Sequence, residues 1–227
     1  MPTESAPVAQ PAQRDLPGPR STVPETWRWV WRDIAFRLAP FALATAFYAR
    51  FWGGSAAGVG LTAAYLPRDL LLGTLLGVPL AALAAWFRRL VAPGYRLPTP
   101  ADQALETAFY FVLNAPIEEL FWRGTVQTLA IAGVTALLGR GALAAGIGFA
   151  LATAVFGAYH RLGKWSWRSI AGVTFAGAVF GLSYLLQPAP RSILLPSVIH
   201  GFATAGFLSW GDVALHRWHR HGARRRN

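Results

Sequence analysis

The feature that most constrains the fold is a series of apolar runs, each about 20 residues long. A helix of that length crosses the hydrocarbon core of a bilayer and satisfies its own backbone hydrogen bonds there. Hydrophobic residues make up 54% of the chain and charged residues only 14%, whereas a typical soluble domain carries about 25% charged residues. We therefore predict an all-α fold, a polytopic transmembrane helical bundle with about six to eight membrane helices.

The apolar runs predict one transmembrane helical domain over residues 27–215. Residues 1–26 are rich in Pro and Ala and lack the apolar core of a signal peptide, so we predict a disordered cytoplasmic tail. Residues 216–227 are predicted to form a basic cytoplasmic tail. The membrane segments are expected at about Ile34–Trp52, Ala64–Phe87, Asp102–Leu138, Ala142–Tyr159, Ser169–Leu186 and Ile193–Trp210.

The basic residues mark the predicted cytoplasmic loops. The net charge of +11 could suggest a nucleic-acid partner, but the arginines lie between apolar runs, where they are typical of cytoplasmic loops. Placing both termini in the cytoplasm requires the long element at residues 102–138 to count as one crossing, bent near Pro116 and Gly124 or continued by an interfacial segment. We expect an integral protein of a bacterial inner membrane, in contact with lipid and without a nucleic-acid partner.

Three charges lie within six residues near the middle of this long apolar element: Glu118, Glu119 and Arg123. Each charge near the middle of a bilayer costs about 2.5–3.5 kcal/mol on insertion scales. Glu119 and Arg123 are four residues apart and share a helix face, which predicts an internal salt bridge. Glu118 points about 100° away from that face, so it needs another partner or water, and burial would make it a stronger base.

Two histidines in later segments could join Glu118. His160 ends one apolar run, and His200 lies inside another, beside the small residues Gly201 and Ala203. Because a buried polar group in lipid needs a partner, the three side chains could converge and activate a water. The same three could form a zinc site, although the chain has no HExxH motif. The absence of cysteine excludes disulfides, thiolate zinc sites and cysteine nucleophiles.

The order and spacing of these motifs resemble the CAAX protease and bacteriocin-processing family of intramembrane proteases. Glu118-Glu119 followed by Arg123, then Phe156 four residues before His160, then His200 carry the resemblance, which covers residues 102–210 as a protease-like core. It implies an intramembrane endopeptidase without a cofactor. It also implies that Glu118 and His160 activate the water, and that His200 helps to hold the oxyanion, with Glu119 and Arg123 as structural support.

One position departs from the family pattern. The family has an asparagine or aspartate four residues after the last histidine, whereas this chain has Thr204. A threonine hydroxyl can still donate a hydrogen bond to an oxyanion, from a different position. Three functions therefore stay open: an endopeptidase that acts on an unknown peptide or membrane protein, an inactive scaffold or immunity-type protein, and a proton-coupled transporter that uses Glu118.

Overall fold

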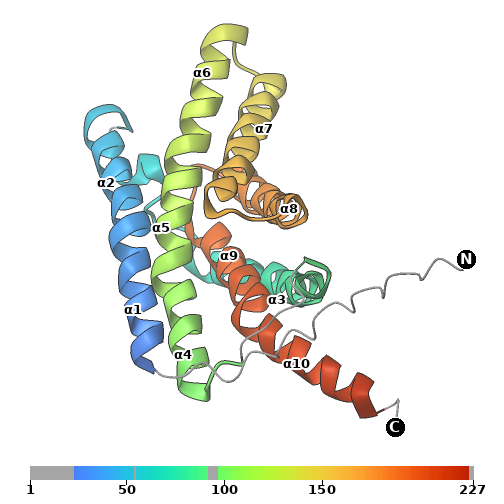
Figure 1. The fold of residues 1–227 in the computed structure, drawn as a ribbon. Coiled ribbons are helices and arrows are strands. Elements are labelled where there is room, and N and C mark those ends of the chain that lie inside the picture. The colour runs from blue at the N-terminus through green and yellow to red at the C-terminus, as the bar shows by residue number, and fades with distance from the viewer. Residues whose placement is uncertain (1–22, 54, 92–96, 225–227) are drawn as a thin grey trace, which may run out of the picture.

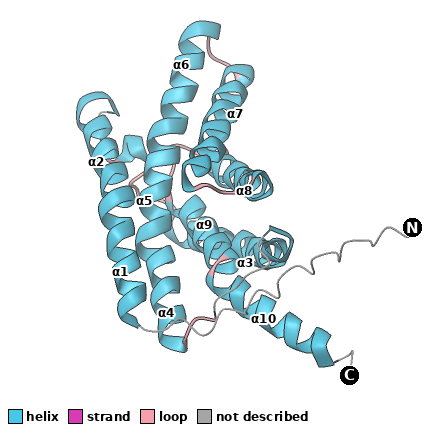
Figure 2. Ribbon diagram, in the orientation of Figure 1, coloured by secondary structure: helices cyan, strands magenta, loops and turns pink. Residues whose placement is uncertain are grey.

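The computed structural model describes residues 23–53, 55–91 and 97–224, and all regular secondary structure in these ranges is helical. The N-terminal helix combines α1 (Val23–Asp33), the π turn η1 (Ile34–Leu38), α2 (Ala39–Tyr48) and the π turn η2 (Ala49–Gly53). After the short 3₁₀ turn η3 (Ala57–Val59), α3 spans Leu66–Val91. The all-α helical bundle predicted from the apolar runs is confirmed (Figures 1 and 2).

The long apolar element is one uninterrupted helix from Pro100 to Leu138. It consists of α4 (Pro100–Phe109), η4 (Tyr110–Asn114), α5 (Ala115–Glu119), η5 (Leu120–Gln127) and α6 (Thr128–Leu138). At about 1.5 Å per residue these residues extend about 58 Å, well beyond the roughly 30 Å of a hydrocarbon core. In Figure 1 this helix runs the full height of the molecule beside the N-terminal helix.

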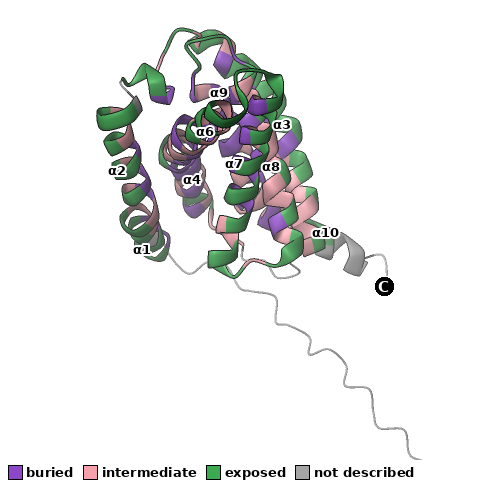
Figure 3. Cartoon of the chain, turned by 90° about the horizontal axis from the view of Figure 1, so that it is seen from above, coloured by how far each residue is buried: buried purple, intermediate pink, exposed green. Residues whose placement is uncertain are grey.

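The remaining helices pack against these two. They are α7 (Ala142–Tyr159) with the 3₁₀ turn η6 (His160–Gly163), α8 (Trp167–Leu185), α9 (Leu194–Phe207) and α10 (Ser209–Arg224). Helix α9 lies at the centre and contacts α3, α8, α5 and α10. Buried positions gather on the inward faces of the bundle, while the outward face of α2 is exposed (Figure 3).

Helices extend across both ends of the predicted domain, residues 27–215. The predicted N-terminal tail lies outside the described residues as far as residue 22, but residues 23–26 already form the first turn of α1. The buried Thr26 hydroxyl donates to Asp102 Oδ1 at 2.7 Å, which fixes that turn against α4. At the other end α10 continues past residue 215 to Arg224. Its first half is held to the bundle by the Asp212 pair with Arg88 of α3 at 2.8 Å and by the buried Leu215.

Prolines explain two of the π turns. Pro40 and Pro116 each follow a π turn by two residues, at η1 and η4. A proline inside a helix has no N–H to donate, and its ring clashes with the carbonyl four residues earlier. Widening the preceding turn relieves that clash without ending the helix. The bend expected near Pro116 therefore takes the form of a π turn, and Gly124 lies in a second one, η5.

Close contacts between helices occur at glycines. The GxxxG glycines Gly73 and Gly77 lie against Val198 and Phe202 of α9. On the other side of the same pair, Gly206 lies against the backbone of Ala81, so a Cβ there would stand 2.5 Å from the Ala81 carbonyl oxygen. These contacts let α3 and α9 approach closely, as small residues do in membrane bundles.

The protein is an integral membrane protein. Within the described residues, three helices are individually long and apolar enough to cross a bilayer: Leu66–Val91, Ala142–Gly163 and Trp167–Leu185. Their outward faces expose large apolar side chains, among them Leu71, Leu75 and Leu143, as a lipid-facing surface requires. Among the other described helices, the two longest contain π turns, and α9 and α10 are shorter.

Two glycines of α7 offer a matched test of this packing. An added Cβ at Gly148 would stand 2.6 Å from the Ile131 backbone of α6, whereas one at Gly146 would meet nothing within 4 Å. We expect Gly148→Ala to destabilise the protein by about 1–3 kcal/mol through overpacking. Gly146→Ala should be neutral or stabilising by up to about 1 kcal/mol. Thermal unfolding in detergent, followed by tryptophan fluorescence, measures both, and equal midpoints would contradict this packing of α6 on α7.

Candidate active site

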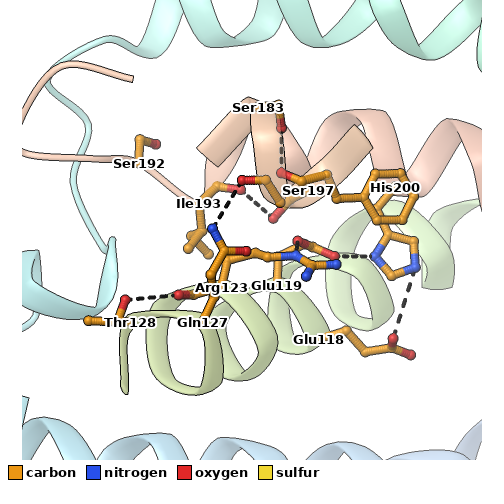
Figure 4. Close-up of polar contacts among 12 residues, drawn as sticks. Glu118, Glu119, Arg123, Gln127, Thr128, Ser183, Ser192, Ile193, Ser197 and His200 are labelled. Atoms are coloured by element: carbon orange, nitrogen blue, oxygen red, sulfur yellow. Dashed lines mark hydrogen bonds and ion pairs between the residues drawn. The ribbon is translucent and has the colours of Figure 1, made fainter. Parts of the chain in front are cut away.

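The centre of the site is the carboxylate of Glu119. Its Oε2 accepts a hydrogen bond from Arg123 Nε at 2.9 Å, and its Oε1 accepts one from His200 Nδ1 at 2.7 Å (Figure 4). Glu119 and Arg123 have no solvent exposure, and His200 is 6% exposed. The Arg123 guanidinium also lies over the Phe156 ring, 4.9 Å from its centre. Glu119 thus connects the long helix to α9 through His200, while Arg123 neutralises it from its own helix.

Glu118 points to the other side, as its position on the helix predicts. Its Oε1 forms an ion pair with Arg37 Nη1 and accepts a hydrogen bond from Asn114 Nδ2 at 3.1 Å. Its Oε2 faces His200 Nε2 across 4.0 Å (Figure 4). That gap is too long for a direct hydrogen bond, but one water can bond to both atoms.

The two ring nitrogens of His200 have different partners. Because the Glu119 carboxylate accepts the Nδ1–H, Nε2 is left to face Glu118. A neutral ring would accept a hydrogen bond at Nε2, whereas a protonated ring would donate one. The ring is also stacked on Phe180, with centroids 4.6 Å apart and planes inclined by 15°. Packing and the Nδ1 bond therefore fix the direction in which Nε2 points.

His160 is held in a similar way at the end of α7. Its Nδ1 lies 2.8 Å from the carbonyl oxygen of Phe156. A carbonyl can only accept, so Nδ1 carries the hydrogen, and the Nε2 of the neutral ring carries a lone pair. Aromatic rings of Phe156, Tyr159 and Trp165 lie 4.8–5.9 Å from the imidazole centre and fix its orientation.

One cavity of about 810 Å³ collects these side chains. Its polar lining consists of Asp33, Arg37, Asn114, Glu118, His160, Ser169, His200 and Thr204. Its apolar walls come mainly from α3, α8, α9 and the segments around them, and include aromatic side chains such as Trp29, Phe87 and Phe207. The cavity therefore places a few polar groups within a largely apolar chamber, the usual composition of a ligand site.

The structure brings the four predicted catalytic residues, Glu118, His160, His200 and Thr204, to the wall of this cavity. Glu119 and Arg123 are not among its lining residues and lie behind His200 and Glu118. Sequence reasoning missed Arg37, Asp33 and Asn114. Asn114 could have been found because it is one helical turn before Glu118. Asp33 and Arg37 have the same four-residue spacing, but nothing in the sequence links them to Glu118.

The zinc alternative stays a hypothesis at this site. Among the described residues, no group of three His, Asp or Glu side chains that could hold a metal ion is found. The hydrogen bond between His200 Nδ1 and Glu119 leaves Nε2 as the nitrogen that could ligate a metal. A metal assay of the purified protein decides between the two versions.

Replacing Glu119 with glutamine tests the central contact. The variant would leave the buried Arg123 guanidinium without a counter-charge, a change that typically costs about 3–5 kcal/mol. We expect Glu119→Gln to lower the thermal midpoint strongly in detergent, while Glu118→Gln, at the cavity wall, lowers it much less. A Glu119→Gln protein as stable as the wild type would show that the Arg123–Glu119–His200 contact does not hold the helices together.

Comparison with known proteins finds one family model that matches the segment carrying most of this site. Residues 100–206 match the family model described as type II CAAX prenyl endopeptidase Rce1-like. No curated protein and no solved structure gives a significant match to the chain. The matched segment contains Glu118, Glu119, Arg123, His160, His200 and Thr204 but not Arg37. Over residues 100–206, the chain is therefore similar to the Rce1-like family of type II CAAX prenyl endopeptidases.

Proposed function

We propose that this protein is an intramembrane endopeptidase that hydrolyses a peptide bond with a water activated by Glu118. The observation that carries this proposal is that Glu118 Oε2 faces His200 Nε2 across 4.0 Å at the wall of a cavity that His160 and Thr204 also line. A general base must lie within hydrogen-bond reach of the proton it removes, directly or through one water. The similarity of residues 100–206 to an endopeptidase family supports the same reaction.

In the proposed mechanism Glu118 removes a proton from the water. Oε2 is the oxygen that faces the cavity partner His200, because Oε1 is bonded to Arg37 and Asn114. The Nε2 lone pair of His160 accepts the second hydrogen of the water and orients it. The hydroxide oxygen then bonds to the peptide carbonyl carbon, and the carbonyl electron pair moves onto its oxygen. Glu118 delivers the proton to the amine nitrogen as the C–N bond breaks.

His200 is proposed to stabilise the oxyanion. To donate from Nε2 while Nδ1–H is bonded to Glu119, the ring must carry both hydrogens and a positive charge. The Glu119 carboxylate lies 2.7 Å from Nδ1, on the side of the ring opposite Nε2. The Thr204 hydroxyl, one helical turn later on α9 and at the same cavity, would supply a second donor.

The proposal also covers the substrate, the membrane and the orientation of the protein. The substrate would be a peptide or a membrane protein that enters from the lipid, and the reaction would need no cofactor and no nucleic acid. We propose a bacterial inner membrane as the location, with both chain termini in the cytoplasm. The basic loops and ends of the sequence support that orientation.

Glu118→Gln and His160→Ala test the mechanism directly. In liposomes, with a farnesylated CAAX peptide and an unprenylated peptide library as substrates and mass spectrometry as the readout, we expect wild type to generate new peptide ends. Both variants should lose at least about 100-fold in rate, the low end of what a positioned acid–base group contributes. A chelator in every reaction keeps metal-dependent contaminants silent.

Equal cleavage by wild type, Glu118→Gln and His160→Ala would contradict the mechanism. In the alternative, the protein is catalytically inactive and acts as a membrane scaffold or immunity-type protein. Thr204 favours this alternative because the family pattern has an asparagine or aspartate at that position. That alternative expects no cleavage by any of the three proteins and full phenotypic complementation by Glu118→Gln.

Thr204 has its own pair of substitutions. Thr204→Val keeps the shape and removes the hydroxyl, so the rate should fall by about 10²–10³, the usual effect of losing one oxyanion donor. Thr204→Asn installs the amide that the family pattern has at this position and should keep or raise the rate. Steady-state cleavage rates at matched protein concentration measure both. A Val variant as fast as wild type would remove Thr204 from the mechanism.

A further inference from the structure

The two oxygens of Glu118 have unequal surroundings. Oε1 holds two donors, Arg37 Nη1 and Asn114 Nδ2, whereas Oε2 faces His200 Nε2 without direct bonding distance. A carboxylate that is free to rotate about its terminal bond would exchange the two oxygens. Here the donors distinguish them, so one oxygen is bound to the protein and the other is presented toward His200.

The Arg37 guanidinium is shared between Asp33 and Glu118 Oε1. Its Nε and Nη2 both bond to the carboxylate of Asp33, at 2.7 and 2.5 Å, which leaves Nη1 for Glu118. Such a two-point contact fixes the plane of the guanidinium as well as its position. Because Asp33 is one helical turn before Arg37, the N-terminal helix sets this geometry by itself.

The two donors also have a common structural origin. Arg37 lies in the π turn η1, three residues before Pro40, and Asn114 lies in the π turn η4, two residues before Pro116. Each extra residue in a π turn changes the direction in which the neighbouring side chains project, and such turns are frequent at functional sites. Here both turns contribute a donor to the same carboxylate oxygen.

A buried carboxylate base faces two problems that these contacts solve. An isolated charge in an apolar interior is strongly disfavoured, and a nearby cation offsets that effect. A base that can turn also presents its lone pairs in many directions, which lowers the fraction of productive encounters with water. Arg37 supplies the charge and, with Asn114, a fixed direction.

We infer that Arg37 is a positioning residue for Glu118, and that the N-terminal helix, outside the family-matched segment, completes the active site. The inference rests on the proposed function. Arg37 holds Oε1 through Nη1 and so directs Oε2 toward the water that bridges to His200. It contacts Glu118 and takes no part in proton transfer. Asn114 assists at the same oxygen from the long helix.

The test compares Arg37→Ala, Arg37→Lys and the control Arg32→Ala, which removes an exposed arginine from the same helix. In the liposome cleavage assay we expect Arg37→Ala to lower kcat by at least about 10-fold with little change in KM, since the contact orients the base rather than the substrate. Low millimolar methylguanidinium should restore part of that rate, and Arg37→Lys should retain part of it. Arg32→Ala should match the wild type.

Infrared spectroscopy can follow the contact between Arg37 and Glu118 without measuring activity. The infrared difference spectrum between wild type and Glu118→Gln isolates the carboxylate bands of Glu118. In the Arg37→Ala background those bands should shift, because the ion pair to Oε1 is lost, whereas the Arg32→Ala background should leave them in place. This measurement needs folded protein only, and Arg37→Gln takes the place of Arg37→Ala if the alanine variant does not fold.

The outcomes separate this inference from the proposed function. An Arg37→Ala protein that cleaves as fast as wild type, or faster, overturns it, and a faster variant would show that Arg37 restrains Glu118. A slow variant that methylguanidinium does not rescue, with Glu118 bands unchanged, also overturns it. If the wild type cleaves nothing, the proposed function fails, and the infrared bands alone decide whether Arg37 holds Glu118.

Discussion

The structure depends on one buried carboxylate. Glu119 accepts from Arg123 on its own helix and from His200 on α9, so it connects the long helix to the centre of the bundle. A buried charge without partners would destabilise the fold, while a paired one fixes the register of the two helices. The same bond determines which nitrogen of His200 faces Glu118. The fold and the proposed chemistry therefore share a single contact. Glu119 sets the direction in which His200 Nε2 points, and Glu118 supplies the oxygen that would react.

Helix geometry explains how adjacent glutamates come to have different roles. Consecutive residues on a helix are about 100° apart, so Glu119 points into the bundle and Glu118 toward the cavity. The prolines add to this effect. Pro40 and Pro116 widen the turns before them, and those turns carry Arg37 and Asn114, the two donors to Glu118 Oε1. Residues that would weaken a helix in water thus shape the site in a bundle, where neighbouring helices hold the chain together.

Much of the site was readable from local spacing. The Glu119–Arg123 pair follows from four residues on one helix, and Glu118 as the residue without that partner follows from the same geometry. The motif order placed His160 and His200 near Glu118, and both line its cavity. Arg37 was not readable, because its ion pair joins residues 81 positions apart. The helix at residues 23–26 was missed as well, because it is secured by the distant Asp102 rather than by its own composition.

The apolar runs already specify an all-helical membrane protein, since a helix satisfies its own backbone within a continuous apolar run of about 20 residues. The sequence also specifies the Glu119–Arg123 pair and the set of polar residues that need partners. The packing of the helices, by contrast, brings Arg37 to Glu118 and turns Oε2 rather than Oε1 toward His200. The physical reason is that contacts within a helix follow from its period, whereas contacts between helices depend on how whole faces pack.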